Sequence, residues 1–163
     1  MCPKTYGKRV RQVVAPVSAP AQQSAKVIIP GDQIAVRNGL RALFDTILLR
    51  SLPEDGRSTA EIVLAEALNN IVEHAYSSHD GEIEITLHLR QNELVCKISD
   101  TGLPMPDGKL PAGILALLEP PADLPEGGFG WHLIRSLSKD LDYRRENGRN
   151  LLSFRLDTQQ CGD

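Results

Sequence analysis

Residues 82–99 read EIEITLHLRQNELVCKIS, and this stretch decides the fold class. Over residues 82–90, isoleucine and leucine alternate with polar residues, which is the period of a half-buried strand. Gln91 and Asn92 then predict a turn, and a second alternating strand follows over residues 94–99. Two strands joined by so short a turn pair antiparallel. The sequence therefore predicts an antiparallel hairpin.

A short strand and two helices are expected upstream of this hairpin. The strand covers Lys26–Ile29, and Asp32 is positioned to cap the first helix. The expected apolar positions of that helix are Ile34, Leu40, Leu43, Phe44, Ile47 and Leu48. Residues 51–57 are typical of a loop, and a capping box over residues 58–61 predicts a second helix from Thr59 to about Tyr76.

A third helix and a second hairpin are expected downstream. The helix opens in the segment Gly-Gly-Phe-Gly at 127–130 and runs to about Lys139. Asn147-Gly148 is a strong hairpin-turn signal between strands expected near 141–146 and 151–156. Hairpins with helices grouped elsewhere indicate an α+β fold. We predict a two-layer α/β sandwich whose mixed, mostly antiparallel sheet carries helices on one face.

Composition limits the classes of function. The chain has 163 residues, which fits one domain, and 41% of them are apolar, which is enough for a core. Aromatic residues make up only 4%, a poor basis for stacking single-stranded nucleic acid. The net charge is −3, and the first 24 residues hold four basic and no acidic residues, so the remainder carries −7. We therefore expect no direct nucleic-acid partner.

Cysteine usage and hydropathy bear on the compartment. Cys2, Cys96 and Cys161 are far apart and odd in number, which argues against a disulfide framework or structural zinc site. The longest nearly apolar run, residues 110–118, is far shorter than the roughly 20 residues of a membrane span. Residues 8–21 have a basic start, but their middle is too short and proline-broken for a signal peptide. We expect a cytoplasmic protein with no membrane partner.

The chain divides into a domain and two terminal segments. Residues 1–25 lack any sustained period, so we expect a flexible basic tail, either a partner-binding arm or a leader without function. The domain covers 26–157, and 158–163 are expected to be disordered. Between residues 100 and 127 lie six of the eleven prolines. A connection this long inside a domain is usually a lid or binding loop.

Three polar patterns could carry chemistry. Glu66, Asn70 and His74 recur at one-turn intervals and share one face of the second helix, away from its apolar face. Asparagine supplies a neutral oxygen ligand for Mg²⁺, and a glutamate one turn earlier could accept a proton from an attacking hydroxyl. Taken alone, this pattern also fits a solvated helix face.

The other two patterns suit a nucleotide. Asp100, at the end of a strand, could accept a hydrogen bond from an exocyclic amine, and Gly102 allows close backbone approach. Gly127, Gly128 and Gly130 precede a helix whose free amides would attract phosphate. Taken alone, these patterns also fit an ordinary turn and a loop before a helix. Together with the helix they supply a metal ligand, a base reader and a phosphate site, which predicts one Mg-nucleotide pocket.

At this point the sequence resembles the GHKL (Bergerat-fold) ATPases, and among them the anti-sigma factor serine/threonine kinases. Residues 65–76 (AEALNNIVEHAY) are similar to the family's N box, 98–102 (ISDTG) to its first glycine box, and 127–134 (GGFGWHLI) to its second. The resemblance covers about residues 26–157.

The resemblance implies a role for each matching residue. Glu66 would be the catalytic base, and Asn70 the Mg²⁺ ligand, with His74 beside it in the cofactor site. Asp100 would contact the adenine amino group of ATP, and Gly102 would shape that pocket. The remaining implied residues are Gly128 and Gly130 at the phosphates and Ser153 as a hydroxyl near adenine. Residues 103–127 would form the ATP lid.

The family reaction is transfer of the γ-phosphoryl group of ATP to a small anti-anti-sigma (STAS) protein. By resemblance the chain would be a homodimer, and a sigma factor could be a second partner. The lid segment ends in Leu124-Pro125-Glu126, and Lys109 is its only cation. Because phosphoryl transfer needs charge neutralisation, a nucleotide-gated binding module without kinase activity is the alternative. A histidine-kinase catalytic domain is less favoured, since the chain has no room for a phosphoacceptor hairpin.

Overall fold

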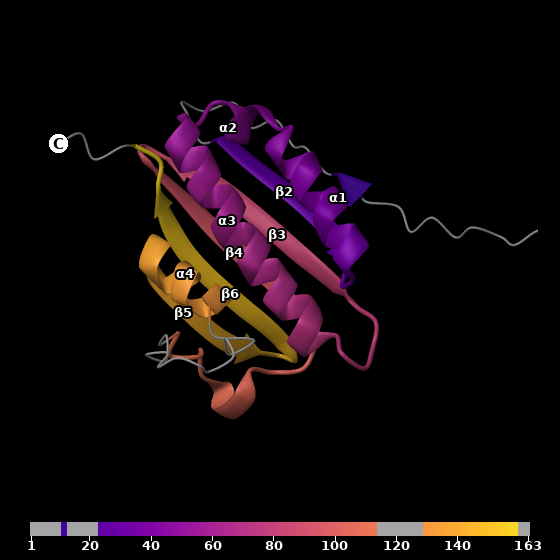
Figure 1. The fold of residues 1–163 in the computed structure, drawn as a ribbon. Coiled ribbons are helices and arrows are strands. Elements are labelled where there is room, and N and C mark those ends of the chain that lie inside the picture. The colour runs from indigo at the N-terminus through magenta and orange to yellow at the C-terminus, as the bar shows by residue number, and fades with distance from the viewer. Residues whose placement is uncertain (1–10, 13–22, 114–128, 160–163) are drawn as a thin grey trace, which may run out of the picture.

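The computed structural model describes residues 11–12, 23–113 and 129–159. In chain order its elements are β1 (Arg11–Gln12), β2 (Gln23–Pro30), α1 (Gln33–Phe44), α2 (Ile47–Arg50), α3 (Glu54–Asn70), the π-helical turn η1 (Ile71–Ala75), β3 (Glu82–Arg90), β4 (Glu93–Asp100), the 3₁₀ turn η2 (Pro106–Gly108), α4 (Phe129–Leu137), β5 (Lys139–Glu146) and β6 (Arg149–Asp157). The strands form one sheet of six in the order β1-β2-β3-β4-β6-β5. Helices α1, α3 and α4 lie over one face of this sheet (Figure 1).

The predicted α+β sandwich is confirmed, and every pairing between the described strands is antiparallel. The central hairpin β3–β4 has the predicted strands and turn, with Ile85 opposite Ile98. At the β5–β6 turn, Asn147 and Gly148 both have positive φ, 50° and 79°. This is the conformation that the Asn-Gly pair favours in a two-residue hairpin turn.

The sheet reaches further toward the N-terminus than predicted. Strand β2 begins at Gln23 rather than Lys26, and Arg11–Gln12 pairs with β2 opposite Ile28 and Val27. Residues 11–12 and 23–25 are therefore strand residues inside the range predicted to be a flexible tail, and the rest of that range lies outside the described residues.

Helix α3 begins earlier than predicted. The capping box at 58–61 lies inside the helix, which instead starts after Pro53, whose φ of −54° and ψ of 152° end the preceding loop. Glu54 and Asp55 occupy the first turn, where carboxylates interact favourably with the helix dipole. Gly56 is buried in this turn, close to the backbone of Thr158. A side chain would not fit there, since a Cβ on Gly56 would lie 2.7 Å from the carbonyl oxygen of Thr158.

The first predicted helix is divided in two. Helix α1 begins at the predicted cap, where Asp32 Oδ1 accepts from the Ala35 amide at 2.8 Å, but it ends at Phe44. Thr46 caps the short helix α2. Two of the apolar positions of the predicted helix, Ile34 and Ile47, lie on the surface, 75% and 79% exposed.

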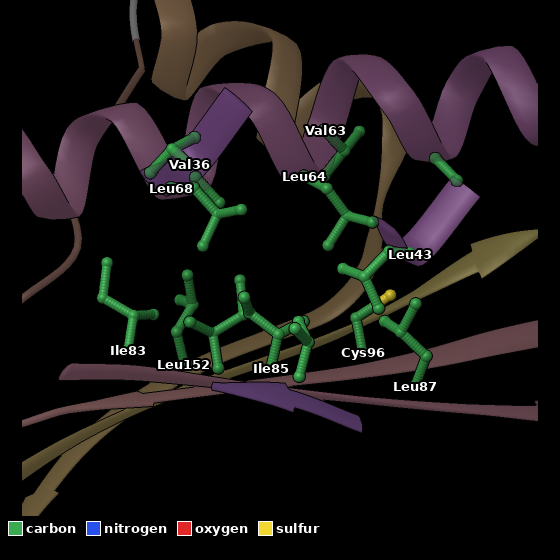
Figure 2. Close-up of a cluster of buried hydrophobic side chains, with 14 of the residues drawn as sticks. Val36, Leu43, Val63, Leu64, Leu68, Ile83, Ile85, Leu87, Cys96 and Leu152 are labelled. Atoms are coloured by element: carbon green, nitrogen blue, oxygen red, sulfur yellow. The ribbon is translucent and has the colours of Figure 1, made fainter. Parts of the chain in front are cut away.

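The hydrophobic core lies between the helices and the sheet. Figure 2 shows Val36, Leu43, Val63, Leu64 and Leu68 pointing from the helices toward side chains that rise from the strands. Burying each large aliphatic side chain stabilises the fold by about 1.5–3 kcal/mol. In the part of the chain that the structure describes, no helix has the length and apolar character needed to cross a bilayer.

The ordered chain extends past the predicted domain end. Thr158 is buried, and its amide donates to the Asn92 carbonyl at 2.8 Å, so the expectation of disorder from residue 158 was wrong at this residue. Of the predicted lid, residues 103–113 are described and 114–127 lie outside the described residues.

Candidate functional site

The polar face of α3 carries Glu66 and Asn70, and His74 follows in η1. The buried side of the same helix, including Val63 and Ala67, packs into the core, which leaves this face turned away from it. At Asn70 the helix changes from α to π geometry, and such turns often occur at functional sites. Asn70 Nδ2 is buried and has no hydrogen-bond partner among the described residues. A buried amide in this state favours a ligand that completes its hydrogen bonding.

The start of α4 lies against this face. A Cβ added to Gly130 would lie 2.6 Å from Glu66 Oε2 and 3.5 Å from Asn70 Nδ2. A larger residue at position 130 would displace the Glu66 carboxylate from its present place. The structure thus brings Glu66, Asn70 and Gly130 together. The first amides of a helix lack intrahelical partners and attract anions. Gly128, the other predicted phosphate-binding residue, lies outside the described residues.

Asp100 lies at the end of β4 and is only 3% exposed. Its Oδ1 accepts hydrogen bonds from the Gly102 amide and from Asn150 Nδ2, both at 2.8 Å. Burial raises the pKa of the Asp100 carboxyl, against the lowering effect of these two hydrogen bonds and of Arg145 and Arg149. Both hydrogen bonds from described residues are to Oδ1, so Oδ2 can accept from a ligand.

A small cavity connects Asp100 with the α3 face. It has a volume of about 40 Å³ and is lined by Asn70, His74, Ala75, Asp100, Asn150, Leu152, Tyr143 and residues of the segment 103–106. This segment is held by the Leu103 amide, which donates to the Ala75 carbonyl at 2.9 Å. Gly102 approaches so closely that a Cβ would lie 2.6 Å from Ala75 O. The predicted residues Asn70, His74 and Asp100 therefore line one cavity, and Gly102 packs against Ala75, which lines it as well.

Ser153 is not brought to this cavity. Strand β6 alternates, and Leu152 and Phe154 are the residues that face the helices. Ser153 lies on the other face of the sheet, where it lines a groove with Lys97 and Arg144. Because successive side chains of a strand point to opposite faces, an assignment shifted by one or three residues places the side chain on the wrong side. The placement of Ser153 near the site was wrong.

Asn150 is the residue that the sequence reasoning missed. It is buried, pairs with Asp100 across β4 and β6, and belongs to the inward-facing set of β6. A polar residue in register with Leu152 and Phe154 was the available signal, since buried polar side chains usually have a specific partner.

The donor set fits a magnesium–nucleotide complex better than a bare metal ion. Among the described residues, no three His, Cys, Asp or Glu side chains are placed to hold a metal. Mg²⁺ is commonly held by one or two protein oxygens together with substrate phosphates. The unpartnered Asn70 Nδ2 can donate to a phosphate oxygen, and the side-chain oxygen of the same residue is the atom that could share Mg²⁺ with the phosphates, beside Glu66 and the start of α4.

An antiparallel α+β sandwich, a cavity lined by Asn70 and Asp100, and a helix start placed against Glu66 and Asn70 are together typical of a nucleotide-binding domain. The model of the histidine kinase-like ATPase domain matches residues 29–156, and the chain belongs to that family. The chain is similar to the serine-protein kinase RsbW of Bacillus thuringiensis (strain Al Hakam) and of Bacillus cereus (strain AH820), each 34% identical over 94 residues. It is also similar to the serine-protein kinase RsbW of Bacillus mycoides (strain KBAB4), 32% identical over 100 residues.

These matches are partial. The 94 matched residues are 56% of this chain and 59% of the first two relatives, and the 100 residues are 60% of this chain and 62% of the third. The chain thus spans less than two thirds of the length of the relatives it matches.

Proposed function

We propose that the chain is an ATP-dependent protein serine/threonine kinase that phosphorylates an anti-anti-sigma STAS-domain partner and also acts as an anti-sigma factor. The observation that carries the proposal is the contact of Gly130 with Glu66 and Asn70, because it joins a candidate base and a candidate metal ligand to a phosphate-binding helix start. The names of the similar Bacillus proteins, serine-protein kinases, support the same reaction.

In the proposed reaction a seryl or threonyl oxygen of the partner attacks the γ-phosphorus of ATP. The bond to the β–γ bridging oxygen breaks, ADP leaves, and the hydroxyl proton passes to the Glu66 carboxylate. Glu66 is half-buried and lies against the α4 start, which positions its carboxylate beside the place where phosphates would bind. Asp100 and the cavity above it would hold the adenine, which fixes the other end of the nucleotide.

Mg²⁺ held by the Asn70 side-chain oxygen and the phosphates would neutralise charge on the transferring group. Asn70 itself would orient the phosphates toward the α4 amides. His74 is exposed at the rim of the same cavity, where it would contact the bound nucleotide.

The proposal extends to the organisation of the molecule. Residues 26–157 would be the kinase domain, with residues 103–127 as its ATP lid. The chain would work as a cytoplasmic homodimer, with a sigma factor as the second partner and without direct contact to nucleic acid.

A direct test is phosphate transfer from labelled Mg-ATP to a purified STAS-domain protein. Replacing Glu66 by Gln keeps the shape but removes the base, so we expect transfer to fall by about 10²–10⁴-fold while ATP binding by calorimetry is retained. Glu61→Gln is the matched control, because Glu61 is an exposed carboxylate on the same helix. Transfer by Glu66→Gln at the wild-type rate would remove Glu66 from the mechanism.

A nucleotide-gated binding module is the second candidate function. Lys109 is the only lysine or arginine between residues 103 and 127, and it is exposed, so the lid segment offers little charge to stabilise a transferring phosphoryl group. This candidate predicts ATP binding and ATP-dependent capture of the partner with no labelled product. The labelling experiment separates the two.

A further inference from the structure

The face of the sheet opposite the helices of Figure 1 carries a second hollow, the sheet-face groove. Its volume is about 570 Å³, and its polar lining includes Thr86, Lys97, Ser99, Arg144, Arg149 and Ser153. The strand register brings these residues together, since Lys97 of β4 lies opposite both Thr86 of β3 and Ser153 of β6. Ser99 is the next residue of β4 on the same face. The groove is therefore separate from the cavity beside Asp100, which lies on the side of the helices.

The charge of the groove is opposite in sign to that of the whole chain. Three cations, Lys97, Arg144 and Arg149, line it beside one carboxylate, Glu84. Glu84 is already paired with Lys26 at 3.1 Å, and Arg144 is paired with two exposed carboxylates of its own strand. The chain as a whole carries −3, so this groove is a local concentration of positive charge on an acidic protein.

Two of the three cations have capacity for a ligand. Among the described residues, neither Lys97 nor Arg149 forms a salt bridge. Arg149 donates from Nε and Nη2 to the neutral Ser99 Oγ at 2.9 and 2.7 Å, which holds its guanidinium against β4. Partial burial and the charges of Arg90 and Lys97 lower the pKa of His88, which also lines the groove. An anion would offset this positive potential.

The form of the groove favours a small anion over a segment of a protein partner. Its volume lies in the range of small-molecule sites, roughly 300–1,000 Å³. Protein interfaces depend on aromatic and other large anchor residues, and the described residues that line this groove include no Trp, Tyr or Phe. Guanidinium and ammonium groups are instead the donors that bind phosphate oxygens.

We propose that the sheet-face groove is a second binding site, which takes a small phosphorylated molecule. Lys97 and Arg149 bind its phosphate oxygens, and the hydroxyl groups of Thr86 and Ser153 donate further hydrogen bonds. This inference goes beyond the proposed kinase function and does not depend on it, because the groove shares none of its polar residues with the cavity beside Asp100.

The test uses inorganic pyrophosphate as the probe, titrated into the isotope-labelled full chain without ATP or magnesium and followed by two-dimensional NMR. We expect the backbone amide signals of Thr86, Lys97, Ser99 and Ser153 to shift and to saturate. Arg149→Gln removes charge-assisted hydrogen bonds to the probe, so its dissociation constant should rise on the order of 10-fold.

Arg41→Gln is the matched control, because it makes the same charge change at an exposed residue of α1, on the other side of the sheet, and should keep the wild-type dissociation constant. Equal constants for the two variants, or shifts that never saturate, would overturn the proposal, since they indicate only a diffuse attraction to surface charge. If circular dichroism shows that Arg149→Gln does not fold, Lys97→Gln replaces it with the same expectation.

Two further results would overturn the proposal by assigning the groove to another occupant. Groove amides that respond to the concentration of the chain and not to pyrophosphate would show that a second copy covers this face. Amides that respond only to a STAS-domain protein would show an interface with that partner. A chain that binds pyrophosphate in the groove but fails to bind Mg-ATP would contradict the proposed function alone.

Discussion

At the scale of single residues, Gly130 tests the proposed catalytic geometry. An alanine Cβ would lie 2.6 Å from Glu66 Oε2, which is the far end of a flexible side chain. We expect Glu66 to swing aside while the backbone stays in place. A displacement of about 1 Å at a catalytic group can cost on the order of 100-fold in rate. Gly130→Ala should therefore lose about that much phosphate transfer, measured with labelled ATP.

The same variant should melt within a few degrees of the wild type, because only a half-buried side chain has to move. Ser136→Ala, an exposed substitution on the same helix, is the control for any general effect on α4. A Gly130→Ala chain that transfers phosphate at the rate of Ser136→Ala would show that the position of Glu66 does not limit the reaction.

The sequence predicted which candidate site residues lie near one another only where their spacing along one element decides it. Glu66, Asn70 and His74 follow one another along one helix, and Asp100 and Gly102 along one turn, so their neighbours in sequence are their neighbours in space. Asn150 and Ser153 depend on the register of β6 against β4, which no local pattern determines. The error at Ser153 and the omission of Asn150 have this common cause.

At the scale of elements, the π-helical turn η1 holds the end of β4 against the end of α3. Ala75 is the contact residue: its carbonyl accepts from the Leu103 amide, and a Cβ at Gly102 would lie 2.6 Å from both the Cβ and the carbonyl oxygen of Ala75. Because a backbone atom is one of the two neighbours, one of the elements has to shift to admit a methyl group. We expect Gly102→Ala to lower the free energy of unfolding by about 1–3 kcal/mol, measured by urea denaturation.

A second variant tells whether the carbonyl or the methyl group sets this cost. In a chain that already carries Ala75→Gly, the methyl group of residue 75 is gone and only the contact with its carbonyl oxygen is left. Gly102→Ala should therefore lower the free energy of unfolding less in that chain than in the wild type, but not by zero. Wild-type stability of Gly102→Ala would contradict the close packing of η1 against β4.

Element boundaries could be predicted only where the signal is local. The alternation of β3 and β4 and the Asn-Gly turn fix their own limits. The start of α3 is different, because the contact between Gly56 and Thr158 joins residues about a hundred positions apart and favours a longer helix than the capping box indicates. The division between α1 and α2 has a local cause, because Thr46 caps α2. It was missed because the apolar pattern continues across the division.

At the scale of the whole molecule, the order of the strands assembles the site. Strand β6 inserts between β4 and β5, which places Asn150 opposite Asp100 and brings Tyr143 and Arg145 of β5 within hydrogen-bond distance of Asn150. Helix α4 then packs beside α3 on the same face of the sheet (Figure 1). The pocket is therefore formed by segments from both halves of the chain, and a ligand in it would connect them.

A nucleotide that connects α3, β4 and α4 should stabilise the whole fold, because it binds the native state and not the unfolded chain. At a free concentration 100 times its dissociation constant, such a ligand adds about 2.7 kcal/mol to the free energy of unfolding. For a domain of this size each kcal/mol raises the melting temperature by roughly 2–4 °C, so Mg-ATP should raise it by about 5–10 °C. In Asn70→Ala the shift should no longer depend on magnesium, because the side-chain oxygen that would share the ion with the phosphates is gone. A melting temperature that Mg-ATP leaves unchanged in the wild type, at concentrations where calorimetry shows saturation, would mean that the nucleotide does not bind between these three elements.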